Sequence, residues 1–296
     1  MFLNPPPFPD DLVGLYPQIA DEPEFRPVDH LALESGGDRI SLDALGYLPE
    51  DLNGLPTDCA AVGPFRVLSP AGVEALRTVA LAFRKLDPAT EDDPKAGYQK
   101  PRGLAYSSRF VRSMCADRDL AVFLSRQAGT PLAHHGALTL PTIVYAPTSI
   151  ERSNQGWHLD TVGFACVISL NDPDTLDGGR FQYFKGTKQA VANRLGVDPR
   201  DLRRSVGHIT ELPTDQVETV RYPAAGWGML MQGQMVVHRG EPLNAPAERM
   251  VLVTALMSLN PLIPDPTYWS EIETWNSPAV SEERRRHEIW RRNSSE

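Results

Sequence analysis

Two histidines and one aspartate stand out in this sequence because their types and order suit a metal ion. His158 and Asp160 lie two positions apart in an apolar stretch, and side chains at this spacing point to the same face of a strand. His238 ends a second apolar stretch and can supply a third ligand. Two imidazoles and a carboxylate on one side of an ion leave three positions open, the arrangement that suits non-haem Fe(II) and oxygen chemistry. We therefore predict that His158, Asp160 and His238 are metal ligands and catalytic residues.

An arginine follows these three residues at a position that suits a carboxylate ligand. Arg249 stands eleven residues after His238, at the start of the next apolar stretch, and its planar cation can bind a carboxylate through two parallel hydrogen bonds. A dicarboxylate cosubstrate would fit between the metal and this arginine. Arg239 competes for the role, but it stands in a turn beside Glu241, where a solvated ion pair is the simpler expectation.

A structural role is the alternative interpretation of the same residues. His158 and Asp160 form a His-x-Asp pattern that a chain of this composition holds by chance about half the time, so the pair alone is weak evidence. The two side chains would then be a buried hydrogen-bonded pair, with His238 at a strand edge. The ordered set with Arg249 favours the metal site. Tyr145 is a further candidate to donate its hydroxyl to the cosubstrate, with a place in the core as the alternative.

The elements that must position these residues change in type along the chain. Helical periodicity predicts one helix from a Ser69 cap to Leu86 and another over 117–128, closed by Gly129 and Pro131. A loop is expected over 88–102. Short apolar runs with turn residues between them then predict strands at 137–146, 156–170, 179–184, 217–222, 226–237 and 250–259. Helices first and closely spaced strands later favour an α+β protein, mainly β in its second half, which is a sandwich or barrel.

Composition divides the remaining sequence into an arm, one domain and a tail. The first 30 residues hold seven prolines, so residues 1–62 are expected to form an extended arm and lead-in. Residues 63–265 form the single domain, with an insertion at about 185–210 that contains two short helices. Residues 266–296 form a helical tail, whose Arg-rich part is expected to be a solvated helix. His134 and His135 are expected at the surface or in a substrate pocket.

Charge and hydropathy exclude some classes of partner. The chain has 38 acidic and 29 basic residues, a net charge of −9, so nucleic acid is not expected as a general partner. The most apolar stretch, 250–259, is far shorter than the roughly 20 residues of a membrane helix. Three widely spaced cysteines form no zinc or disulfide framework, which fits a cytoplasmic protein. A small-molecule substrate is favoured, and the sequence gives no oligomeric state.

The ordered site residues resemble the pattern of the Fe(II)/2-oxoglutarate-dependent oxygenase superfamily. That pattern is His-x-Asp, a distal histidine dozens of residues later, and an arginine roughly ten residues beyond it. The resemblance covers about 139–259 and includes the Gly-Gly-Arg-Phe turn and strand at 178–181. Residues 63–70 also resemble the short strand and capped helix that open phytanoyl-CoA dioxygenase-like domains. The resemblance implies a double-stranded β-helix, a cupin-like jelly roll, with helices packed on one sheet.

The same resemblance implies roles for the site residues. His158, Asp160 and His238 would hold Fe(II), 2-oxoglutarate would chelate the metal, Arg249 would bind its far carboxylate, and O2 would be the second cosubstrate. Hydroxylation of an unactivated C–H bond, with release of succinate and CO2, is the default outcome. Related halogenases carry a small residue in place of the carboxylate so that chloride can bind, and Asp160 therefore disfavours halogenation. Desaturation and ring closure stay open.

A different class of protein remains as the alternative. A cupin-like metal-binding protein, or a non-redox metalloenzyme, would use the same three ligands without 2-oxoglutarate. Arg249 distinguishes the two, because only the oxygenase needs a cation for the far carboxylate of the cosubstrate.

Overall fold

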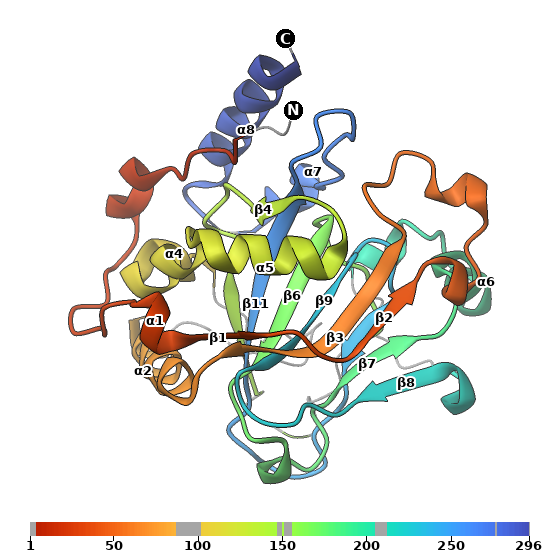
Figure 1. The fold of residues 1–296 in the computed structure, drawn as a ribbon, viewed down its shortest axis with the longest axis horizontal. Coiled ribbons are helices and arrows are strands. Elements are labelled where there is room, and N and C mark those ends of the chain that lie inside the picture. Colours follow the sequence, from red (N-terminus) through yellow and green to blue (C-terminus); the bar gives the residue numbers. More distant parts are fainter. Residues whose placement is uncertain are drawn as a thin grey trace.

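The computed structural model describes residues 4–86, 102–146, 150, 156–204, 212–275 and 277–295. Two antiparallel sheets form its core, with helices covering the outer face of the larger sheet (Figure 1). This arrangement confirms the predicted double-stranded β-helix with helices on one sheet. Within the described residues, no helix is long and apolar enough to cross a membrane.

The larger sheet has the order β1-β3-β9-β6-β11-β4, with β2 added to β3 and β5 added to β11, and the smaller sheet has the order β10-β7-β8. The strands of the larger sheet are β1 (Leu31–Glu34), β2 (Asp38–Ser41), β3 (Cys59–Leu68), β4 (Leu132–His134), β5 (Thr142–Tyr145), β6 (Phe164–Ser169), β9 (Trp227–Met231) and β11 (Met250–Ser258). Those of the smaller sheet are β7 (Phe181–Phe184), β8 (Val217–Val220) and β10 (His238–Gly240). The α-helices are α1 (Pro27–His30), α2 (Pro70–Leu86), α3 (Leu104–Ser107), α4 (Arg109–Cys115), α5 (Arg118–Ala128), α6 (Lys188–Leu195), α7 (Trp269–Ile272) and α8 (Val280–Ser295).

The two long helices expected in the first half are both present. Ser69 begins α2, where its Oγ accepts a hydrogen bond from the backbone N–H of Gly72 at 3.0 Å. Asp117 caps α5 by accepting from Leu120 N–H at 2.8 Å, and Gly129, at φ 69°, ends that helix in the left-handed conformation. The apolar faces of both helices pack in the large core on the outer side of the larger sheet.

Strand alternation separates this outer core from the space between the sheets. On β11 and β5, Leu252, Ile143 and Tyr145 belong to the core under the helices. Val251 and Val144, one position away, line a pocket on the opposite side, which faces the smaller sheet. A one-residue step therefore decides whether a side chain contacts the helices or the pocket.

All six expected strands are shorter than predicted, and two of them are interrupted because the segment passes from one sheet to the other. The strand expected over 156–170 begins only at Phe164. His158, upstream, instead makes an isolated antiparallel bridge to His238 beside the smaller sheet. The stretch expected over 226–237 likewise leaves the larger sheet after Met231 and turns before it joins β10. One run of residues cannot pair in both sheets without such a break, and the apolar pattern alone does not show it.

The predicted arm at 1–62 is wrong in part. Its residues 31–34 and 38–41 form β1 and β2, and both strands pair with β3. The proposed boundary at residue 63 lies within β3, so the lead-in and the domain share one sheet. β4, which extends the other end of this sheet, was also not predicted. Three residues pairing with the end of β11 give too short a pattern to read.

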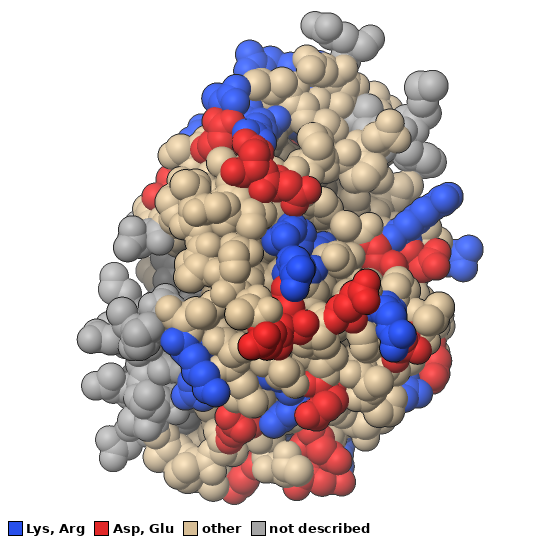
Figure 2. All heavy atoms as spheres, turned by 90° about the vertical axis from the view of Figure 1, so that its left-hand side faces the viewer, with Lys and Arg blue, Asp and Glu red and all other residues tan. Residues whose placement is uncertain are grey.

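The expected solvated helix at the C-terminal end is also wrong in part. Helix α8 buries Glu283 and His287 on one face. Its exposed arginines pair within the chain, as Arg286 does with Asp11 at 2.6 Å and Arg284 with Glu273 at 2.8 Å. Figure 2 shows acidic and basic side chains side by side on the face that is at the left of Figure 1, without segregation by sign.

The insertion contains the two short helices that were expected. α6 is followed by a 3-10 helix over Asp201–Arg204. Val191 and Leu202 from these helices pack with Trp157 and Leu159 in one buried cluster. Because Trp157 and Leu159 alternate with His158 along the chain, this cluster fixes the segment that carries the predicted ligands. The end of the insertion, residues 205–210, and nearly all of the expected loop at 88–102 lie outside the described residues.

His134 and His135 are not at the surface: their exposed fractions are 3% and 1%. Neither ring nitrogen of His134 has a hydrogen-bond partner among the described residues. Burial therefore lowers the pKa of His134 to about 4, because the charged imidazole would lose its hydration without compensation.

This buried imidazole predicts a pH dependence of stability. Below about pH 6.5 the unfolded chain takes up a proton at His134, whereas the native state takes one up only near pH 4. As the pH is lowered from about 6.5 to about 4, the free energy of unfolding should therefore decrease, by up to about 3 kcal/mol from this group. His134→Leu should flatten the fall. Urea unfolding of both proteins at about pH 7.5 and about pH 4.5 measures it, and an equal fall in the two would contradict this origin.

Candidate metal centre and adjoining pocket

The structure brings His158, Asp160 and His238 together. One ligand atom from each residue lies within 4.8 Å of those of the other two. His238 Nε2 is 3.6 Å from Asp160 Oδ2, and the two imidazole rings have their centroids 4.4 Å apart. The isolated bridge places the histidines opposite each other, since each donates its backbone N–H to the other's carbonyl at 3.0 Å. Two residues on, Asp160 reaches the same side.

The hydrogen bonds of the two histidines orient them as metal ligands. His158 Nδ1 lies 2.9 Å from the carbonyl oxygen of Gly156, and His238 Nδ1 lies 2.9 Å from that of Val236. A carbonyl only accepts, so in the neutral tautomer that makes this bond Nδ1 carries the proton and the lone pair is on Nε2. Such contacts fix the tautomer and orientation of metal-bound histidines.

The carboxylate of the third residue supplies the charge that a cation requires. Asp160 Oδ2 is buried and has no hydrogen-bond partner among the described residues. A buried carboxylate oxygen without a partner is costly. A divalent cation beside two imidazole nitrogens would satisfy this oxygen, so the donor set fits a metal such as Fe(II).

A second cluster of the same composition differs in its hydrogen bonding. His135, Asp265 and His287 also offer ligand atoms within 4.8 Å of one another, and His287 Nε2 is 2.8 Å from Asp265 Oδ2. However, His135 Nδ1 accepts the backbone N–H of Ala137 at 3.2 Å, so the proton of the neutral ring is on Nε2, which faces Asp265. We interpret this cluster as a clasp that holds α8 against the jelly roll.

The charge of the clasp is set by the same contacts. Burial acts to raise the pKa of Asp265, but the two imidazoles oppose this effect and hold the pKa below its usual value. The buried carboxylate is therefore ionised, with His287 Nε2 2.8 Å from its Oδ2 and a hydrogen bond from Thr267 Oγ1 to its Oδ1 at 3.0 Å. That is the opposite of Asp160, whose Oδ2 lacks any described donor.

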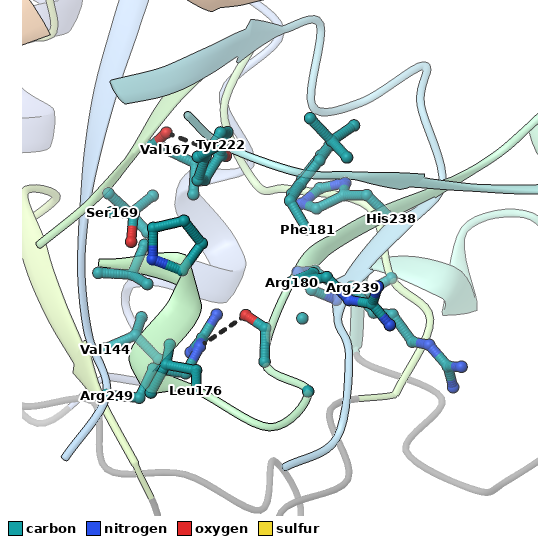
Figure 3. Close-up of a pocket in the computed structure, with 18 of the residues that line it drawn as sticks. Val144, Val167, Ser169, Leu176, Arg180, Phe181, Tyr222, His238, Arg239 and Arg249 are labelled. Atoms are coloured by element: carbon teal, nitrogen blue, oxygen red, sulfur yellow. Dashed lines mark hydrogen bonds between the residues drawn. The ribbon is translucent and has the colours of Figure 1, made fainter. Parts of the chain in front are cut away.

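A pocket between the two sheets adjoins the first cluster (Figure 3). His158, Asp160 and His238 lie among its lining residues, and Arg249 lies there too, at the start of β11. The remaining wall is largely apolar, with valines from the larger sheet and Phe181 from the smaller one. The predicted ligands and the predicted carboxylate-binding arginine thus share one cavity.

The Gly178-Gly179 turn positions Arg249. Arg249 Nε donates to the carbonyl oxygen of Gly179 at 2.9 Å, a contact also drawn in Figure 3. Gly179 has φ +72°, and a Cβ there would lie 2.9 Å from Arg249 Cδ. At Gly178, with φ +85°, a Cβ would lie 2.1 Å from the carbonyl oxygen of Pro242. Only glycine fits both positions, so this turn is part of the arginine's site.

This contact gives a testable expectation. Gly179→Ala should displace the Arg249 side chain and weaken 2-oxoglutarate binding by roughly tenfold, which corresponds to loss of one good hydrogen bond. Metal binding should be unchanged, because neither glycine of the turn nor Arg249 belongs to the candidate metal-ligating cluster. Calorimetric titration of 2-oxoglutarate and, separately, of a divalent metal measures both. An equal loss for metal and cosubstrate would point to general damage instead.

Tyr145 does not lie in this pocket, contrary to the prediction. It is 1% exposed, on the outer face of β5, and its hydroxyl donates to the carbonyl oxygen of Ala80 at 2.7 Å. The pairing of β5 with β11 turns Val144 toward the pocket and therefore turns Tyr145 toward the helices. The alternative interpretation, in which Tyr145 is a core residue, is the correct one.

A different tyrosine, missed from the sequence, lines the pocket near Arg249. Tyr222 is buried, and its hydroxyl lies 3.4 Å from the carbonyl oxygen of Val167. Burial raises its pKa above the usual value, so the hydroxyl keeps its proton and can donate it. Ser169 offers a second hydroxyl in the same cavity. The sequence signal that could have identified Tyr222 is its two-residue spacing from Val220, because both residues line the pocket.

Arg239 is not a solvated residue either. It is 7% exposed, donates from Nε to Gln182 Oε1 at 2.8 Å, and its guanidinium carbon lies 4.5 Å from the ring centroid of Trp157. Pairing of β10 with β7 places it opposite Gln182. Glu241 instead takes Arg180 in a bidentate pair, with both contacts at 2.6 Å.

Two histidines and an aspartate share an inter-sheet pocket with an arginine in this jelly roll, an arrangement that fits a metal-binding double-stranded β-helix protein. The chain belongs to the Halogenase D family, whose model matches residues 93–275, more than half of the chain. This match confirms the resemblance to the Fe(II)/2-oxoglutarate-dependent superfamily. The matched family is a different one from the phytanoyl-CoA dioxygenase-like branch that residues 63–70 resemble.

No protein with a curated description matches the sequence. Solved structures with similarity include AviO1 from Streptomyces viridochromogenes Tue57, with 16% identity, 77% of this chain and 99% of that chain covered, and a TM-score of 0.46. The α-ketoglutarate-dependent carbocyclase SnoK from nogalamycin biosynthesis has 16% identity, 75% and 89% coverage, and a TM-score of 0.45. HygX from Streptomyces hygroscopicus, with nickel and 2-oxoglutarate bound, has 13% identity, 71% and 87% coverage, and a TM-score of 0.45. These likenesses are distant, and we base the function on the residues of the site.

Proposed function

We propose that this protein is a non-haem Fe(II)- and 2-oxoglutarate-dependent oxygenase that hydroxylates an unactivated C–H bond of a small molecule and releases succinate and CO2. One observation carries the proposal. Asp160 Oδ2, which is buried and has no hydrogen-bond partner among the described residues, clusters within 4.8 Å with ligand atoms of two imidazoles oriented by backbone carbonyls, in the same pocket as Arg249. A cation would satisfy the aspartate oxygen, and the planar guanidinium of Arg249 can bind a carboxylate.

Each residue of the site then has a defined task. His158, Asp160 and His238 would hold the metal on one face, and Arg249 would bind the far carboxylate of 2-oxoglutarate. Bound Fe(II) would supply oxygen activation coupled to decarboxylation of the cosubstrate. Tyr222 takes the place we first gave to Tyr145, as a hydroxyl that can donate to the cosubstrate. The valines make much of the wall apolar, and charged contacts are stronger beside apolar surroundings than in bulk water.

Asp160 supports hydroxylation over halogenation, although the family is described as Halogenase D. A halogenase of this superfamily leaves the carboxylate position to a halide. Here the carboxylate is present, and its Oδ2 lies 3.6 Å from His238 Nε2. A halide would have to displace an anionic ligand of the chain from this position.

Turnover of 2-oxoglutarate without substrate tests this proposal. Aerobic incubation with Fe(II) should release succinate at a slow basal rate, and omission of Fe(II) should stop it. Small metabolites can then be screened for faster succinate release. Products should gain an oxygen atom from labelled O2 and no halogen when bromide is added. A halogenated product would overturn the hydroxylase assignment, and absence of any succinate would favour the non-redox metalloprotein.

A further inference from the structure

A glycine in another part of the chain lies directly against the carboxylate of Asp160. Gly233 is buried in the turn between β9 and β10. A Cβ at this position would lie 2.1 Å from Asp160 Oδ2, 2.6 Å from Asp160 Cβ and 2.7 Å from Asp160 Cγ. These distances are all far shorter than a carbon contact allows. The side chain of Asp160 therefore occupies the space that any other residue at 233 would fill.

The backbone of the two residues is joined as well. Asp160 donates its N–H to the carbonyl oxygen of Gly233 at 2.8 Å. This bond holds the Asp160 backbone at a fixed distance from the turn. The aspartate is then confined by the glycine on one side and by His238, with Nε2 at 3.6 Å from Oδ2, on another.

The turn that carries Gly233 is itself held by hydrogen bonds, which oppose its movement away from Asp160 if residue 233 is larger. Gln232 Nε2 donates to the carbonyl oxygens of Cys59 at 2.7 Å and Thr57 at 3.0 Å. The carbonyl oxygen of Gln232 accepts the N–H groups of Met235 and Val236 at 2.9 and 3.0 Å. Bonds to β3 and within the turn thus fix the residues on both sides of the glycine.

We propose that Gly233 is the positioning residue for the carboxylate ligand, an inference that rests on the proposed metal site. Carboxylate ligands are commonly oriented by hydrogen bonds from neighbouring groups. Asp160 Oδ2 has none among the described residues, so contact with the Gly233 backbone takes over that task. Residue 233 thereby determines whether the chain can present a carboxylate at 160, the feature that separates a three-ligand site from one with a vacant position.

A double-mutant cycle on metal affinity tests this role. Co(II) is titrated into metal-free wild type, Gly233→Ala, Asp160→Gly and the double variant, with affinity and visible absorption followed anaerobically. Gly233→Ala should lose roughly 10- to 100-fold in affinity, the usual cost of losing such support, and its cobalt spectrum should approach that of Asp160→Gly. In the Asp160→Gly background the alanine should cost nothing further, because no carboxylate competes for the space.

Thermal unfolding of the metal-free proteins gives a second measurement, which remains informative if one variant folds poorly. Gly233→Ala should melt below the wild type, and adding Asp160→Gly should restore the melting temperature by removing the clash. Unchanged cobalt affinity in Gly233→Ala, or equal losses in both backgrounds, would overturn the positioning role while leaving the metal site standing. A wild type that binds no cobalt would instead overturn the proposed function and this inference with it.

Discussion

Replacing His238 with alanine is expected to abolish tight Fe(II) binding and, with it, succinate release. The variant loses an imidazole whose tautomer is fixed by the Val236 carbonyl, and it leaves Asp160 with one fewer neighbour to share a cation. The variant would retain two of the three predicted metal ligands. We expect a loss of at least about 100-fold in metal affinity, beyond the 10- to 100-fold typical of an outer contact. Metal titration of the purified, metal-free protein measures it.

The second His-Asp-His cluster supplies a matched control. His287→Asn removes an imidazole from a set of the same composition and similar spacing, but His135 there carries its proton on Nε2. Wild type and His287→Asn should therefore each bind one metal ion per chain, with the control losing only thermal stability. Two ions per wild-type chain, or full metal affinity in His238→Ala, would contradict the assignment of the two clusters.

Arg249→Leu should weaken 2-oxoglutarate binding at least about 100-fold, or about 3 kcal/mol, because two charge-assisted hydrogen bonds to a carboxylate are lost in a largely apolar pocket. Metal affinity should be unchanged, since Arg249 is not a member of the metal-ligating cluster. Calorimetric titration of the metal-loaded protein with 2-oxoglutarate gives the ratio of dissociation constants.

The control for this variant is Arg221→Leu, which removes an arginine that is mostly exposed and paired with Asp174. Its cosubstrate affinity should stay within about twofold of wild type, because exposed pairs contribute little. An Arg249→Leu protein that binds 2-oxoglutarate as tightly as wild type would instead favour a metalloprotein that does not use this cosubstrate.

The sequence was sufficient to select the candidate ligands that the structure brings together, because the chemistry we predict for them depends on residue type and order. His158 and Asp160 share a face at their two-residue spacing, and His238 ends an apolar run, so only the meeting of the two segments had to be assumed. The structure supplies that meeting through a single antiparallel bridge. The helices that follow Ser69 and Asp117 could equally be predicted from the sequence, since caps and apolar spacing are local signals.

The errors share one cause: they depend on contacts between segments that are distant in the sequence. Whether Tyr145 or Tyr222 lines the pocket follows from strand register, which a run of alternating residues does not contain. Arg239 became buried because β10 placed it opposite Gln182. The clasp of His135 and His287 joins segments about 150 residues apart, and no local pattern links them.

The central claim is that one pocket holds Fe(II) and 2-oxoglutarate together. It is tested most directly by adding 2-oxoglutarate without oxygen to the protein loaded with Fe(II) and recording the visible spectrum. The account predicts a saturable charge-transfer band with one cosubstrate per iron, which arises only when 2-oxoglutarate chelates the metal. Iron that binds tightly but gives no band at any cosubstrate concentration would contradict the oxygenase assignment and leave a metalloprotein of another kind.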